Sequence, residues 1–155
     1  MAVLEQLEKL SDASFLNLYE TLSEKGFGPL DSEVAKALKF RPQAIKKLPI
    51  QKRAQHAKRI LLRNNNAELC YELFGTYLMR DRKELVTGFL EATDVPHEDG
   101  MLEDTDKAPD PTKLGPAIQE LDGKFEPDDV TLYLALAVEQ WPQSSELKDV
   151  WEARG

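Results

Sequence analysis

The chain has 155 residues, of which 41% are hydrophobic and 31% charged, so it is a globular composition of one domain or two small ones and not a disordered chain. Its longest unbroken apolar run has seven residues, which predicts no membrane-spanning segment, and its single cysteine, Cys70, excludes an internal disulfide and suggests a cytoplasmic location. The net charge of −8 is distributed very unevenly.

Leucine recurring at helical spacing, with far fewer Val and Ile residues, predicts an all-α protein. We expect about eight to ten short helices, arranged as an irregular bundle or as stacked helical hairpins. In the N-terminal part, helices are expected over residues 2–10, from a cap at Ser11 or Asp12 to Gly26, over about 31–39, shortly after Pro42, and over about 50–63.

Asn64, Asn65 and Asn66 indicate a junction, and Asn66 is the expected N-cap of a helix over about 67–79. Asp81 followed by Glu84 matches a capping box, which predicts that the next helix begins there. The segment 94–110 holds seven carboxylates, two prolines and little periodicity, so we expect an exposed loop.

Three more helices are expected towards the C-terminus. The first begins near Leu114 and is closed by Gly123, the second is opened by Pro127 and runs to about Trp141, and the last is capped by Ser144 or Ser145. The second is apolar nearly all round, which indicates a buried helix, although its alternating leucines leave a strand as the minor alternative.

The charges divide the chain into two expected halves. Residues 34–67 hold ten basic and no acidic side chains, whereas the other 121 residues hold ten basic and all 28 acidic ones, a net charge of −18. We therefore expect an N-terminal helical half, 1–63, with the basic segment 34–67, and an acidic C-terminal half, 66–155, unless the two form a single packed domain. The basic segment either faces an external partner or packs beside the acidic half.

Residues 31–48 resemble the helix-turn-helix of bacterial regulators over about 18 positions. Inward-facing apolar residues at suitable spacing, such as Val34, Leu38 and Ile45, carry the resemblance, which implies DNA binding. Two positions depart from the pattern, because Lys39 stands where the turn usually has glycine and Pro49 shortens the second helix. An ordinary pair of helices would give the same spacing.

The candidate residues for binding nucleic acid or an acidic partner are the polar and basic side chains expected to point outward. They are Arg41, Gln43, Lys46, Lys47, Lys52, Arg53, Lys58 and Arg59. The only aromatic residue in the basic segment is Phe40, so contact with phosphates is a better expectation than base stacking.

Signals for catalysis, cofactors and metals are poor. The acidic loop fails the EF-hand pattern, because Val95 stands where the first carboxylate should be when Gly100 is the loop glycine. Phosphate-binding glycine loops and nucleophile elbows are absent from the sequence. Cys70 could pair with His56 or His97, but a cysteine on an apolar helix face is usually a buried small hydrophobe.

The sequence thus predicts a non-catalytic helical interaction module that binds a protein partner, with no cofactor and no metal. The alternative is a DNA-binding protein that uses the helix-turn-helix-like segment 31–48 and the basic helix 50–63. A basic face that is exposed favours nucleic acid, and basic side chains paired with the acidic half favour the protein-binding interpretation.

The dependence of stability on salt separates the two arrangements of the basic segment. If the segment pairs with carboxylates in the fold, added chloride screens the attraction and the melting temperature falls. A melting temperature that rises between low and moderate chloride would instead indicate a segment facing solvent, whose self-repulsion is being screened. Exposed ion pairs contribute only ~0–1 kcal/mol each, so the sign of the change in melting temperature, and not its size, distinguishes the two arrangements.

Overall fold

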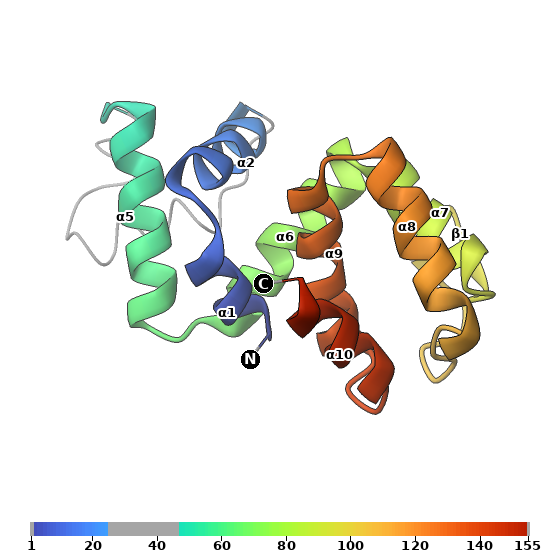
Figure 1. Cartoon of the computed structure of the whole chain (residues 1–155). Coiled ribbons are helices and arrows are strands. Elements are labelled where there is room, and N and C mark those ends of the chain that lie inside the picture. Colours follow the sequence, from blue (N-terminus) through green and yellow to red (C-terminus); the bar gives the residue numbers. More distant parts are fainter. Residues whose placement is uncertain (1, 25–46, 155) are drawn as a thin grey trace. The chain divides into compact units, whose positions relative to one another are not determined.

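The computed structural model describes residues 2–24 and 47–154 (Figure 1). Within these ranges the chain forms eight α-helices, one short 3-10 helix and one two-stranded hairpin, so the all-α prediction is confirmed. In chain order the elements are α1 (Ala2–Lys9), α2 (Asp12–Glu24), α5 (Ile50–Arg63), α6 (Ala67–Asp81), α7 (Lys83–Ala92), β1 (His97–Glu98), β2 (Met101–Leu102), η1 (Pro111–Lys113), α8 (Leu114–Lys124), α9 (Pro127–Gln140) and α10 (Ser145–Ala153). The helix expected over 31–39 and most of the helix-turn-helix-like segment lie outside the described residues.

The chain divides into two compact units, which we call unit 1 (Val3–Leu73) and unit 2 (Phe74–Gly155). The division falls within α6, whereas Asn64–Asn66, the junction expected from the sequence, lies in the turn before α6. Among the described helices, none has both the length and the apolar character that crossing a membrane requires.

In unit 1, α2 packs alongside α5 (Figure 1). Ser11 caps α2, because its hydroxyl accepts a hydrogen bond from the Ser14 amide at 3.1 Å, as the sequence predicts. The apolar stripes of the two helices face the core of the unit; they comprise Phe15, Leu18, Tyr19 and Leu22 on α2 and Ala54, Ala57, Ile60 and Leu61 on α5.

The asparagine turn between α5 and α6 also follows the prediction. Asn65 has a φ of 49°, a left-handed conformation that asparagine tolerates better than most residues. The Asn66 side chain accepts a hydrogen bond from the Leu69 amide at 3.2 Å, which makes Asn66 the N-cap of α6. Cys70 is buried on the apolar face of this helix, where its thiol donates to the Val3 carbonyl.

In unit 2, α9 is buried on nearly every side. Pro127 occupies its first turn together with Asp128 and Asp129, as expected for a proline-led helix start. Residues 132–137 are all buried, and the Tyr133 ring meets that of Phe89 on α7 edge to face at 5.0 Å. The minor alternative of a strand over this stretch is wrong. The stretch is helical, and its leucines at alternate positions are buried because neighbouring helices cover α9 on nearly every side.

Two helix boundaries differ from the sequence prediction. Asp81 is the last residue of α6, and α7 begins at Lys83 without a side-chain cap, so the expected capping box of Asp81 and Glu84 does not form. Gly123 does not close α8 but lies inside its last turn, and the helix ends one residue later. Both differences amount to one or two residues, within the range over which helix ends fray.

The acidic segment 94–110 is more ordered than the exposed loop that the sequence predicts. Asp99 and Gly100 have φ values of 54° and 90° and join β1 to β2 by the two-residue turn that favours Asp-Gly. The His97 ring nitrogen Nδ1 accepts the Gly100 amide at 3.0 Å. Val95 and Pro109 are buried near the two ends, while most of the carboxylates between them are exposed.

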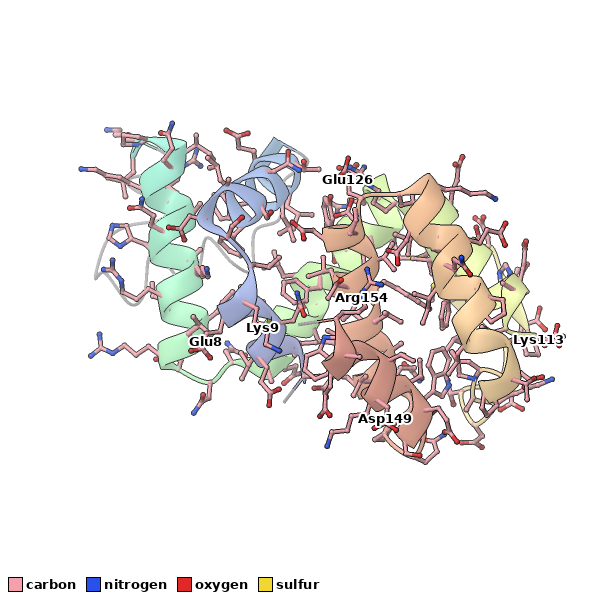
Figure 2. The ribbon with its side chains drawn as sticks, viewed as in Figure 1. Glu8, Lys9, Lys113, Glu126, Asp149 and Arg154 are labelled. Atoms are coloured by element: carbon pink, nitrogen blue, oxygen red, sulfur yellow. The ribbon has the colours of Figure 1, made fainter. Side chains whose placement is uncertain are left out.

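Arg154 joins three helices of unit 2 at the end of α10 (Figure 2). Its guanidinium forms two parallel hydrogen bonds with the Asp122 carboxylate on α8, at 2.7 and 2.8 Å, and donates to the Thr131 hydroxyl on α9 at 2.8 Å. Its side chain is only 18% exposed. Hydrogen bonding to Arg154 lowers the pKa of the Asp122 carboxyl, so this pair favours the folded state at neutral pH.

Replacing Arg154 with alanine should lower the free energy of unfolding by about 1–2 kcal/mol at pH 7, measured by urea denaturation. Because the pKa of Asp122 is lowered in the fold, the contribution is complete above the ordinary carboxyl value of about 3.9 and is lost as the pH falls below it. The two proteins should therefore converge in stability at acidic pH.

The matched control is Lys148→Ala, which removes an exposed cation 3.9 Å from Glu152 on the same helix. It should change the free energy of unfolding by less than about 0.5 kcal/mol. Equal losses in the two variants would contradict the role given to Arg154.

Candidate functional site

The α5 helix separates its buried and charged residues onto opposite faces. Its sequence contains five basic residues and no carboxylate. Lys52, Arg59 and Arg63 are exposed, and their spacings of seven and four residues place them on one face, opposite the buried alanines and leucine. We call these three residues the α5 basic stripe; they span about 16 Å of helix at 1.5 Å per residue.

The other candidates fall into three groups. Arg41, Gln43 and Lys46 lie outside the described residues. Lys47 is exposed in the turn before α5, and Arg53 is half-buried at the edge of the helix. Lys58 has its charged atom in a defined internal contact.

The Lys58 side chain points towards the N-terminal helices of its own unit and not towards solvent. Its Nζ donates to the Leu10 carbonyl at 2.6 Å, just beyond the end of α1, and lies 3.6 Å from the Asp12 carboxylate. The side chain is 16% exposed. Lys58 therefore stabilises the contact between the N-terminal helices and α5, and little of its charge is presented to a partner.

The α5 basic stripe has the opposite character. Among residues 2–24 and 47–154, none of its three side chains forms an ion pair, whereas at least six of the basic residues of unit 2 do. Sequence charge also differs between the units, because residues 74–155 hold eight basic and 19 acidic side chains, a net charge of −11. The stripe is thus a concentrated positive surface on an acidic protein.

One polar cluster in unit 2 was not predicted from the sequence. Tyr77 on α6 donates its hydroxyl to Asp129 on α9 at 3.0 Å, and Arg82 donates to the same carboxylate at 2.8 Å. The Arg82 guanidinium lies 5.7 Å from the centre of the Tyr77 ring. Burial, and then the Asp129 charge, raises the pKa of Tyr77, so the phenol is neutral at physiological pH and the cluster is suited to joining helices.

A cavity of about 500 Å³ in unit 2 is a second feature that the sequence does not indicate. It lies between the end of the acidic segment and the start of α10, with Asp94, Asp110 and Ser144 among its lining residues. These polar groups already serve the fold: Asp94 pairs with Lys113, Asp110 accepts from the Thr112 amide, and Ser144 caps α10. We therefore place the candidate site on α5 and not here.

Metal and thiol chemistry have no support in the described part of the chain. It contains no group of three or more His, Cys, Asp or Glu side chains arranged to hold a metal ion. Cys70 is fully buried, with its thiol directed at a backbone carbonyl, as expected for a small core residue.

No protein-family model matches the chain, and comparisons with curated proteins and with solved structures gave no significant match.

The state of Tyr77 can be tested by ultraviolet titration of the phenols. Because its pKa is raised, Tyr77 should ionise above the ordinary tyrosine value of about 10, and Tyr77→Phe should remove one step above that value. The variant should lose about 1 kcal/mol of stability at pH 8. A group with a raised folded pKa stabilises below its unfolded pKa, so this difference should shrink as the pH rises above about 10. An unchanged titration in Tyr77→Phe would contradict the assignment.

Proposed function

We propose that the protein is a non-catalytic helical interaction module of the cytoplasm that binds an acidic surface of a protein partner through the α5 basic stripe. The observation that supports this proposal is the exposure of Lys52, Arg59 and Arg63 on one face, without an ion pair among the described residues. In the free protein these three exposed cations are hydrated. Their charge attracts an oppositely charged partner from a distance.

The exposed cations of the stripe can bind either carboxylates or phosphates, and exposure by itself does not distinguish between the two anions. Two observations favour carboxylates of a protein. The stripe is short, about 16 Å of helix, which suits a local acidic patch. The chain as a whole also carries a net charge of −8, which opposes the approach of a long polyphosphate.

DNA binding remains the second candidate, because the same stripe continues the basic segment that begins before α5. The helix-turn-helix-like segment on which its sequence specificity would depend lies mostly outside the described residues. The two candidates differ in which polyanion the protein prefers.

The test compares poly-L-glutamate with a 20-base-pair duplex, each labelled and titrated by fluorescence anisotropy at several chloride concentrations. We expect the protein to bind poly-L-glutamate at low salt, with an affinity that falls as salt rises. The variant Lys52→Glu/Arg59→Glu/Arg63→Glu should lose at least tenfold in affinity, because each reversal replaces attraction with repulsion.

The control Lys107→Glu/Lys124→Glu/Lys148→Glu changes the net charge equally but alters exposed lysines of unit 2. It should retain affinity within about threefold, since it leaves the α5 basic stripe intact. An equal loss in both variants would show that binding depends only on net charge and would refute the proposal. Tighter binding to the duplex, with about −0.9 in the log–log salt slope for each cation engaged, would favour the DNA-binding function instead.

A further inference from the structure

Unit 1 contains a small cavity between α2 and α5 that opens to the surface. Its volume is about 140 Å³. The buried side chains of Phe15 and Ala54 form its floor, and exposed residues surround its mouth. The full lining is Asp12, Ala13, Phe15 and Leu16 from α2, and Gln51, Ala54, Gln55 and Lys58 from α5.

The size and chemistry of the cavity suit one apolar side chain. A protein cavity of about 150 Å³ with apolar walls is large enough to hold benzene. The floor and the inner walls here are also apolar, provided by Phe15, Leu16 and Ala54. The polar groups lie at the mouth, where the backbone of a bound segment would pass.

The cavity adjoins the α5 basic stripe. Gln55, at its mouth, is three residues after Lys52 and four residues before Arg59, so all three side chains are neighbours on the helix surface. Residues on either side of an apolar side chain seated in the cavity would therefore reach both cations. The opposite edge is formed by α2, where Asp12 and Glu20 are exposed and would repel acidic residues.

We propose that this cavity receives a single leucine or phenylalanine side chain of an acidic amphipathic segment of the partner, whose carboxylates bind Lys52 and Arg59. The inference rests on the proposed function, since it identifies the kind of partner that the α5 basic stripe binds. The apolar side chain anchors the segment in the cavity, and Lys52 and Arg59 select for its acidic residues. The carboxylates of α2 repel those residues and so determine the orientation in which the segment crosses the cavity.

The experiment uses two synthetic 15-residue helical peptides with glutamates at positions 1, 4, 11 and 15, which differ only in having leucine or alanine at position 8. Both are titrated against the full-length protein by fluorescence anisotropy. We expect the leucine peptide to bind about tenfold more tightly, because its side chain is removed from water in the cavity. The variant Ala13→Trp fills the mouth and should reduce the leucine peptide to the affinity of the alanine peptide.

Ala153→Trp is the matched control, because it places the same indole on an exposed alanine at the end of α10. It should leave both affinities unchanged. As a measurement that needs no variant, amide resonances of Ala13, Leu16, Gln51 and Gln55 should shift more with the leucine peptide than with the alanine peptide.

The outcomes distinguish this inference from the proposed function. Equal binding of the two peptides to the unaltered protein, weakened by Lys52→Glu/Arg59→Glu, would overturn the anchor cavity and leave the basic stripe as the binding surface. An equal loss of both peptides in Ala13→Trp would likewise overturn it. Failure of both peptides to bind the unaltered protein at low salt would overturn the inference together with the proposed function.

Discussion

Burial of α9 is the constraint on which the architecture of unit 2 depends. A helix with six consecutive buried residues needs covering on every side, so α8 and α10 pack along it and α7 contributes the Phe89 ring. The polar links of the unit accordingly converge on the first turns of α9. There the Asp129 carboxylate accepts hydrogen bonds from the Tyr77 hydroxyl and the Arg82 guanidinium. The Arg154 guanidinium donates to the Thr131 hydroxyl one turn from the start of the helix.

The local features of the fold follow from short-range patterns. The sequence is sufficient to place Asn66 as a cap and Pro127 at a helix start, and to reduce two other caps to Ser11 or Asp12 and to Ser144 or Ser145, because each acts on backbone groups within a few residues. It also identifies the buried face of α5, since apolar and basic residues there alternate with the helical period. The Asp99–Gly100 hairpin has an equally local signal, which the abundance of carboxylates around it obscured.

Contacts between distant residues were not accessible in this way. Asp122 and Arg154 are 32 residues apart, and Tyr77 and Asp129 are 52 apart, so no spacing rule connects them. The α2–α5 cavity is equally non-local, because its lining alternates between two helices separated by more than 20 residues. Lys58 is an intermediate case: it follows the buried Ala54 by one turn and so borders the apolar face, but only the position of Leu10 gives its ammonium an acceptor.

The inward turn of Lys58 has a consequence for how this sequence can vary. Under the proposed function, a partner needs only positive charge at Lys52, Arg59 and Arg63, so exchange between lysine and arginine should be neutral there over long divergence. At position 58 the side chain must deliver a compact ammonium group to one carbonyl oxygen, and a planar guanidinium would present its donors in a different geometry. Related chains should therefore keep lysine at this position for folding, while the stripe preserves its charge and not its residue identities.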